Sequence, residues 1–193
     1  MSLAQSLDRI VDIFEHRGVS MRQHLRPGLS RAEVQSVLSP LGLIAPEELY
    51  ELYEWHDGVD DLYEPGLLLG EHQFLPLKEA AKEYPEVVKY YNYDDPSSLD
   101  LTKWFPFASF DGSYFGVYCD PTPFEGLQYP VIRVFEGVNT EFENIDRMVE
   151  TVLEWIRLGV YGTDETLGHD DLRFAIRKRF NPRIDYGSLP SSL

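Results

Sequence analysis

The sequence predicts an α+β protein in which a mainly antiparallel β-sheet is wrapped by helices. Apolar residues recur at helical spacing near both ends of the chain, whereas the middle holds aromatic and β-branched runs separated by turn residues. The predicted strands do not alternate regularly with helices, which disfavours a doubly wound parallel sheet. The 193 residues show no shift in composition and no internal repeat, so we expect a single domain over residues 1–193.

Three short helices are predicted near the N-terminus. Apolar residues recur every three or four positions over residues 3–14, which favours a first helix. Ser30, followed three residues later by Glu33, forms a capping box that begins a second helix. Pro46 lies in the first turn of a third helix, which is expected to end at Gly58.

The middle of the chain predicts strands. Residues 66–77 (GLLLGEHQFLPL) indicate a strand or bent hairpin, and residues 78–91 indicate a helix that is divided or kinked at Pro85. Two aromatic runs within residues 104–121 flank Asp111-Gly112, a dipeptide suited to a tight hairpin turn. Residues 129–137 (YPVIRVFEG) supply another strand.

Helix returns in the last third. An apolar stripe runs from Ile145 to Ile156 behind Asn144, and Gly159 lies where a C-terminal cap belongs. A last amphipathic helix is expected over residues 170–180.

The balance of charge restricts the partners. The chain holds 33 acidic side chains against 17 basic ones, a formal net charge of −16. Such a field repels nucleic-acid phosphates and anionic membrane surfaces, so we expect neither as a partner. It attracts positively charged proteins, although an acidic surface also serves solubility alone.

Cysteine content and the N-terminal segment predict a cytoplasmic protein. A single cysteine, Cys119, excludes an intrachain disulfide framework and a cysteine-rich metal cluster. The opening segment MSLAQSLDRIVDIFEH lacks a basic start followed by an apolar run, so it does not have the form of a secretory signal. No stretch approaches the roughly 20 apolar residues that a membrane span needs.

The sequence shows few motifs for catalysis. No glycine pattern matches a phosphate-binding loop, and the five histidines show no HExxH spacing. The run HDGVDDLYE departs from the order of a calcium loop. Cys119 precedes Asp120, whose charge would raise the thiol pKa, and is interpreted as a packed strand residue. We expect no metal, no cofactor and no enzyme, and a site built from paired carboxylates stays open as an alternative.

The strongest feature is the distribution of charge. Residues 32–77 contain no lysine or arginine. Their ten acids are Glu33, Glu47, Glu48, Glu51, Glu54, Asp57, Asp60, Asp61, Glu64 and Glu71. On the third predicted helix, Glu47, Glu51 and Glu54 share a face and repel one another. The basic residues of the C-terminal segment are Arg173, Arg177, Lys178, Arg179 and Arg183. Either this basic helix neutralises the acidic residues, or the acidic residues steer and hold a basic protein.

Three segments, in order along the chain, resemble the SUKH superfamily of Smi/Knr-like proteins. Residues 46–59 (PEELYELYEWHDGV) are similar to the family's Pro-Glu-x-Leu helix that leads to a Gly-terminated turn, with Asp57 where the family commonly has Asn. Residues 74–84 (FLPLKEAAKEY) are similar to its strand that turns into a helix through Leu-Pro-Leu. Residues 104–121 (WFPFASFDGSYFGVYCDP) are similar to its Trp/Phe-Pro-Phe strand and Gly hairpin, and LEWIRLGVY fits its closing helix.

The resemblance covers about residues 30–162 and implies a mainly antiparallel sheet wrapped by helices, with a non-enzymatic role. It supplies no catalytic residues. Bacterial members of the superfamily are similar to immunity proteins that neutralise polymorphic toxins, often nucleases, and fungal relatives act as regulatory scaffolds. The residues that match the family pattern are interpreted as fold-determining. They are Trp55, Gly58, Trp104, Pro106, Gly112, Gly116 and Asp120.

The charge distribution and the resemblance together predict an immunity protein that binds a basic toxin domain through an acidic surface. The predicted contact residues are Glu51, Glu54, Asp57, Asp60, Asp61 and Glu64. Toxin binding that survives replacement of Asp60 and Asp61 by lysine would contradict this prediction. Two alternatives stay open: a regulatory scaffold that binds endogenous partners, and an enzyme that uses paired carboxylates.

Overall fold

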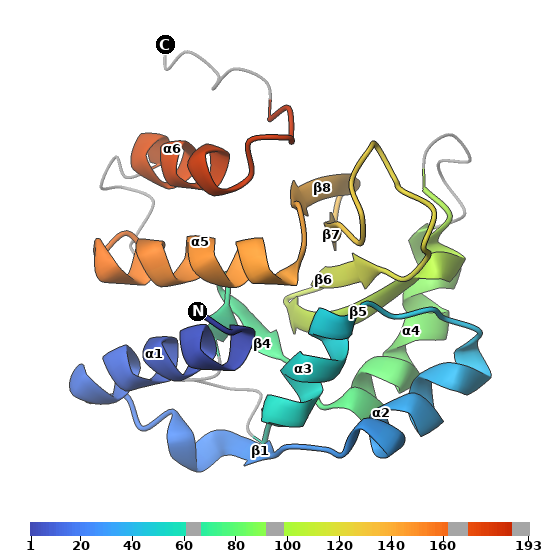
Figure 1. Cartoon of the computed structure of the whole chain (residues 1–193), viewed down its shortest axis with the longest axis horizontal. Coiled ribbons are helices and arrows are strands. Elements are labelled where there is room, and N and C mark those ends of the chain that lie inside the picture. The colour runs from blue at the N-terminus through green and yellow to red at the C-terminus, as the bar shows by residue number, and fades with distance from the viewer. Residues whose placement is uncertain (61–66, 92–98, 162–169, 187–193) are drawn as a thin grey trace.

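A computed structural model describes residues 1–60, 67–91, 99–161 and 170–186 of the chain. Its main sheet has six strands in the order β3-β4-β5-β6-β7-β8, and each strand is antiparallel to its neighbours. The strands are β3 (Leu67–Leu69), β4 (His72–Phe74), β5 (Trp104–Phe110), β6 (Ser113–Tyr118), β7 (Val131–Val134) and β8 (Val138–Phe142). The fold is therefore α+β with an antiparallel sheet, which confirms the predicted class (Figure 1).

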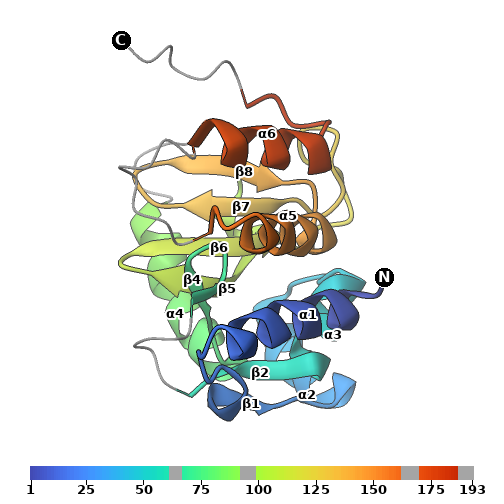
Figure 2. The ribbon, with the colours of Figure 1, turned by 90° about the vertical axis from the view of Figure 1, so that its left-hand side faces the viewer.

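Helices surround this sheet (Figures 1 and 2). They are α1 (Leu3–His16), α2 (Arg31–Leu38), α3 (Glu47–Trp55), α4 (Leu77–Tyr91), α5 (Ile145–Arg157) and α6 (Asp170–Phe180). Two short strands, β1 (Leu25–Pro27) and β2 (His56–Val59), pair with each other beside α3. Helix α1 packs against α5 and α3, α4 packs against β5, and α6 packs against α5.

The predicted caps and turns are present. The Ser30 hydroxyl accepts a hydrogen bond from the Glu33 N–H, and the Glu33 carboxylate accepts one from the Ser30 N–H, which completes the capping box of α2. Asn144 caps α5. At the β5–β6 turn, Asp111 and Gly112 have φ values of 46° and 78°, as a tight hairpin with two left-handed residues requires.

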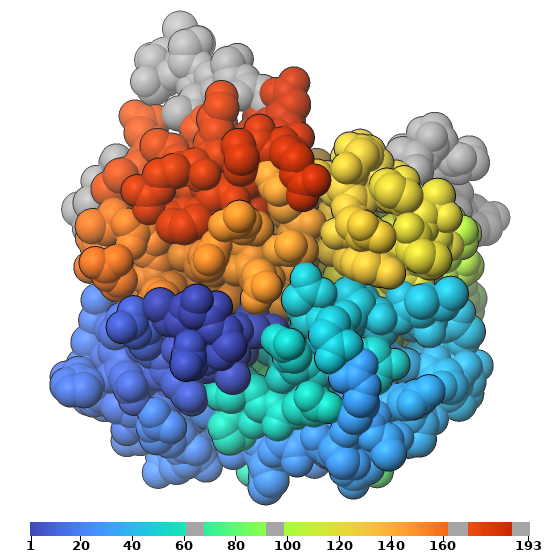
Figure 3. Space-filling view, in the orientation of Figure 1, coloured from blue at the N-terminus to red at the C-terminus, as the bar shows by residue number. Residues whose placement is uncertain are grey.

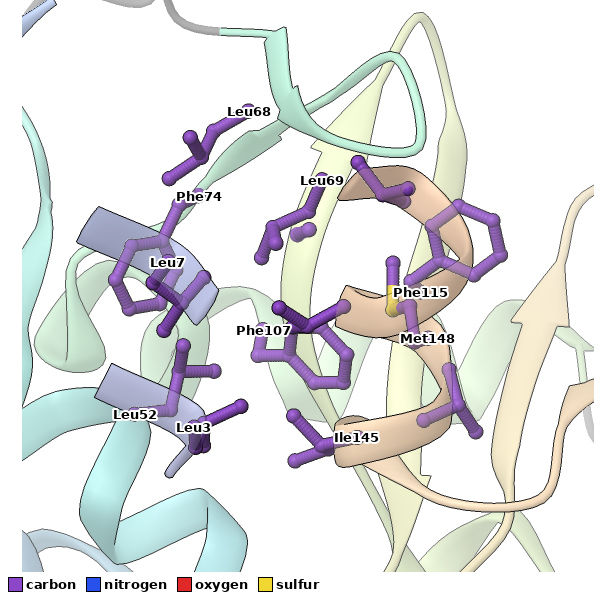
Figure 4. Packing of buried hydrophobic residues seen from close by; sticks show 14 of the residues in the cluster. Leu3, Leu7, Leu52, Leu68, Leu69, Phe74, Phe107, Phe115, Ile145 and Met148 are labelled. Atoms are coloured by element: carbon purple, nitrogen blue, oxygen red, sulfur yellow. The ribbon is translucent and has the colours of Figure 1, made fainter. Parts of the chain in front are cut away.

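The two faces of the sheet bury separate clusters. On one face, Phe115 and Val117 of β6 join the main core with residues from α1, α3 and α5. Figure 4 shows Leu7, Phe107 and Met148 meeting there. On the other face, Trp104 and neighbouring strand residues form a smaller cluster with side chains of α4. Because both faces of the sheet are buried, the sequences of the central strands are nearly continuous apolar runs.

Some predicted boundaries were wrong. Helix α3 ends at Trp55 instead of reaching Gly58, because the chain enters β2 at His56. Helix α4 is continuous from Leu77 to Tyr91 with Pro85 inside it, so of the two predicted alternatives, a division or a kink at Pro85, only the division is wrong. Strands β1, β2 and β8 were not predicted, since none shows an extended run of alternating apolar residues. Within the predicted strand or bent hairpin, residues 67–74 form the β3–β4 hairpin.

Candidate functional site: an acidic face on α3

Helix α3 turns its apolar side chains to the core and its acids outward. Glu47 and Glu48 occupy the first turn, where the N-terminal end of a helix favours negative charge. Glu51 and Glu54 follow at helical spacing and are exposed. The outward side of α3 therefore presents a row of carboxylates.

Arg31, at the start of α2, engages one end of this row. Its guanidinium donates two hydrogen bonds to the Glu47 carboxylate, at 2.6 and 2.5 Å, and lies 4.3 Å from the centre of the Tyr50 ring. These hydrogen bonds lower the pKa of Glu47. Within the described ranges, no ion pair joins Glu51 or Glu54 to a cation.

Glu51 lies at the centre of a group of like charges. Partial burial raises the pKa of Glu48, Glu51 and Asp146, and neighbouring carboxylates raise it further. At Glu51 those neighbours are Asp146, from the start of α5, and Glu47, Glu48 and Glu54 from α3 itself. Negative charge therefore accumulates where α3 meets α5, and a cationic partner would relieve its cost. We call these five residues the acidic face.

Asp57 is not part of the acidic face. Because α3 ends at Trp55, the chain turns Asp57 inward, where it is 7% exposed. Its Oδ1 accepts a hydrogen bond of 2.8 Å from the Leu77 N–H at the start of α4, and its Oδ2 lies 3.5 Å from the Arg26 Nε. Asp57 thus caps α4. This placement corrects the expectation that it contributes to an exposed contact surface.

Only two of the other predicted contact residues belong to the acidic face. Glu51 and Glu54 lie together on the acidic face. Asp60 follows β2 with a 67% accessible side chain, and its Oδ1 lies 3.8 Å from the Arg26 Nε. Asp61 and Glu64 lie outside the described residues.

The basic C-terminal segment does not neutralise the acidic face within the part of the chain that the structure describes. Arg177 pairs with Glu141, Arg179 with Glu154 and Arg183 with Glu143, and none of these acids comes from α3. Arg173 pairs with Glu71 at 3.0 Å, and Glu71 belongs to the β3–β4 turn. Helix α6 lies beyond α5, on the opposite side of it from α1 (Figures 1 and 2). Intramolecular neutralisation by α6 is therefore not what the structure shows for α3.

Trp104, Pro106 and Gly116 act together in the β5–β6 hairpin. Trp104 is fully buried, and its indole N–H donates to the Ile132 carbonyl at 3.2 Å. The indole lies against Gly116, where an added Cβ would come within 2.2 Å of Trp104 Cε2. Pro106 pairs with Gly116, and the register shifts directly after it. All three residues therefore lie in the packing and register of this hairpin, and their fold-determining role stays a prediction.

Three further matched residues also have structural contacts. The Trp55 indole N–H donates to Asp8 Oδ1 at 3.1 Å. Gly58 has a φ of 75°, and a Cβ there would lie 2.3 Å from the Pro76 nitrogen. Asp120 forms an ion pair of 2.7 Å with Lys103, and hydrogen bonds from Lys103 and Thr122 lower its pKa to about 2.

The groups most suited to catalysis are buried or paired. Burial raises the pKa of the Cys119 thiol, which makes it a poor nucleophile. His72 is 2.8 Å from the Ser113 hydroxyl, yet both side chains are buried and His72 Nδ1 contacts the Gly70 carbonyl instead of an orienting carboxylate. Burial lowers the pKa of His72 to about 4.

A search of the described residues finds no cluster of three or more His, Cys, Asp or Glu side chains that would hold a metal ion. In the same part of the chain, every helix is too short or too polar to cross a membrane.

Sequence reasoning did not assign three members of the acidic face to the contact surface: Glu47, Glu48 and Asp146. Glu47 was expected only to share a helix face with Glu51 and Glu54. Asp146 comes from α5, about a hundred residues after Glu51, and only the packing of α5 beside α3 brings them together. Glu48 was among the acids counted, but it was not assigned to the contact surface because it lies off the line joining Glu47 and Glu51. Helical spacing already offered a signal, since Glu48 and Glu51 are three residues apart.

Comparison with known proteins assigns the chain to a family. A search of curated proteins gives no match. The family model described as SMI1 / KNR4 family (SUKH-1) matches residues 28–158, which include α2 to α5, every strand of the main sheet and all of α3. The chain therefore belongs to the SMI1/KNR4 family (SUKH-1).

Proposed function

We propose that this chain is a cytoplasmic immunity protein that binds a polymorphic toxin with a basic, nuclease-like domain. The family includes immunity proteins and Smi1/Knr4 regulators, whose common property is binding to partner proteins. The observation that carries the proposal is the acidic face, in which Glu51 and Glu54 are exposed, adjacent and unpaired among the described residues.

The chemistry of a nuclease explains why such a face would recognise it. A nuclease binds phosphates, so its active cleft concentrates lysine and arginine. Carboxylates spaced along a helix occupy the same cations, and the net charge of −16 speeds the encounter. Each cation placed beside Glu51 also replaces repulsion among carboxylates by attraction. Relief of this repulsion therefore favours formation of the complex.

The test is a binding measurement with a matched charge control. The product of the neighbouring gene is co-expressed, captured on the purified chain and eluted with rising salt, and its Kd is measured by biolayer interferometry. The double variant Glu51→Lys/Glu54→Lys should weaken binding at least roughly tenfold. The control, Glu86→Lys/Glu136→Lys, changes the net charge equally at exposed sites on α4 and in the β7–β8 turn, and should bind nearly as wild type.

Each outcome separates one part of the proposal. Equal weakening by both double variants would show that net charge, and not the acidic face, drives binding. Capture of several endogenous regulators in place of one basic protein would favour the scaffold function. Full binding by Glu51→Lys/Glu54→Lys would refute the acidic face as the contact surface.

A further inference from the structure

A groove of about 610 Å³ lies between the C-terminal halves of α1 and α5. These helices run side by side, and Figure 3 shows α1 (blue) directly below α5 (orange) on one face of the molecule. Ile13 from α1 and Leu153 from α5 give the groove an apolar lining. Leu158, just after α5, is 52% exposed and adds apolar surface near the same end.

The charged residues that line this groove are mostly basic. Arg9, His16, Arg17 and Arg157 line it and are exposed. Asp12 also lines the groove, but its carboxylate pairs with Arg22 at 2.5 Å, so its charge is compensated. Among the described residues, Arg9 and Arg17 have no carboxylate partner, so a chain with a net charge of −16 has a local excess of positive charge here.

The structure accounts for some of these cations and not for others. Arg17 donates a hydrogen bond of 2.7 Å to the Ile156 carbonyl, which satisfies the C-terminal end of α5. Arg157 pairs with Glu154 at 2.9 Å, and Glu154 also pairs with Arg179. Arg9 makes no hydrogen bond or ion pair within the described ranges. Its position beside the apolar lining is thus unexplained by the packing of α1.

The groove also lies partly outside the family match. Helix α1 ends at His16, whereas the match begins at residue 28. Most of the lining, five residues of seven, therefore belongs to an N-terminal segment that the family model does not cover. The acidic face is built instead from α3 and the start of α5, so the two surfaces share no residue.

We propose that this groove binds an acidic amphipathic helical segment of a partner protein. Apolar residues on one side of such a helix fit between α1 and α5, as helices dock into grooves elsewhere. Its carboxylates then meet the arginines at the rim, and this attraction is local because the rest of the chain repels acids. The proposal is independent of the proposed function, since it uses neither the acidic face nor a basic toxin.

Designed peptides test the proposal directly. The first probe is a fluorescein-labelled helix of about 14 residues with Leu on one face and Glu and Ala on the other. A second peptide has Lys in place of Glu, and a third scrambles the first so that its charge stays and its apolar face is lost. Fluorescence anisotropy should show binding of the first peptide only. The methyl NMR signals of Ile13 and Leu153 should shift as it binds.

A pair of variants locates the binding. Arg9→Glu/Arg157→Glu should weaken binding of the first peptide at least roughly tenfold. The control, Lys89→Glu/Arg147→Glu, changes the net charge equally, and Arg147 pairs with Glu150 three residues away just as Arg157 pairs with Glu154. It should bind as wild type.

Four results would overturn the proposal: no binding of the first peptide, equal binding of the Lys or scrambled peptide, equal weakening by both double variants, or unshifted Ile13 and Leu153 methyl signals. Self-association of the protein that Arg9→Glu/Arg157→Glu abolishes would assign the groove to a second copy, and would overturn it too.

Discussion

Replacement of Glu51 by Gln removes one negative charge from the centre of the acidic face. Glu51 lies four residues after Glu47, three after Glu48 and three before Glu54, so it faces three like charges on its own helix. Each such pair destabilises a helix by roughly 0.2–0.5 kcal/mol. Three pairs together cost about 1 kcal/mol, and Asp146 adds repulsion from α5. The variant should therefore be about 1 kcal/mol more stable at pH 7.

Urea unfolding followed by tryptophan fluorescence at several pH values measures this gain. The pKa of Glu51 is raised in the folded state, so the penalty is absent below the unfolded pKa of about 4.3 and develops as pH rises through the folded pKa. The stabilisation of Glu51→Gln should accordingly fade as the pH is lowered from 7 to 4. If the acidic face binds the basic partner proposed above, the same variant should bind it more weakly, so stability and affinity change in opposite directions.

Glu86→Gln is the matched control. Glu86 is also exposed on a helix, where one acid, Glu83, lies three residues before it. Two cations outnumber that acid, since Lys82 lies four residues before Glu86 and Lys89 three after it. Its replacement should bring no gain, because it removes attraction. Equal stabilisation by both substitutions, or a gain at Glu51 that persists unchanged at pH 4, would refute the argument from like charges.

Three further predictions concern the fold. Gly116→Ala should lower the free energy of unfolding in urea by about 3 kcal/mol, because its Cβ would overlap both the Trp104 ring and the Phe105 carbonyl oxygen. Equal stability would refute this overlap. Burial lowers the pKa of His72 to about 4. The free energy of unfolding should therefore fall by about 3 kcal/mol as the pH is lowered from 7 to 4, because the unfolded chain binds this proton more readily than the folded protein. In His72→Gln, the free energy of unfolding should lose this part of its dependence on pH. An unchanged dependence would contradict the argument that burial lowers the pKa of His72. Asn181→Ala should cost about 2 kcal/mol and speed hydrogen exchange at the Glu143 amide, which donates to the Asn181 side chain.

Local signals predicted much of the fold. The capping box at Ser30 and Glu33 and the turn at Asp111-Gly112 depend on residues a few positions apart, so the sequence contains all of the information. The prediction extended the third helix past Trp55 to Gly58 because it, too, relied on a local signal. Gly58 has a positive φ, as a helix-ending glycine would, but its conformation is used where β2 passes the backbone of Pro76. Only the tertiary structure distinguishes these uses.

The acidic face was predictable in part. The repulsion among Glu47, Glu51 and Glu54 follows from helical spacing, and the structure keeps those three exposed. The burial of Asp57 was not predictable, because it follows from the capping of α4 across the fold. The addition of Asp146 likewise depends on where α5 packs.

The order of the strands in the main sheet has a consequence for how the chain folds. Each strand pairs with the strand next to it in sequence, so most of the sheet can grow through pairings that are local along the chain. The pairing of β4 with β5 is the exception, because α4 lies between these two strands in the sequence. The contact between α1 and α5 is of the opposite kind, since Arg17 reaches the Ile156 carbonyl across 139 residues. We expect the sheet to form before α1 docks. During synthesis, α1 then leaves the ribosome before α5 has been made, and the part of its apolar side that packs against α5 stays uncovered until that point.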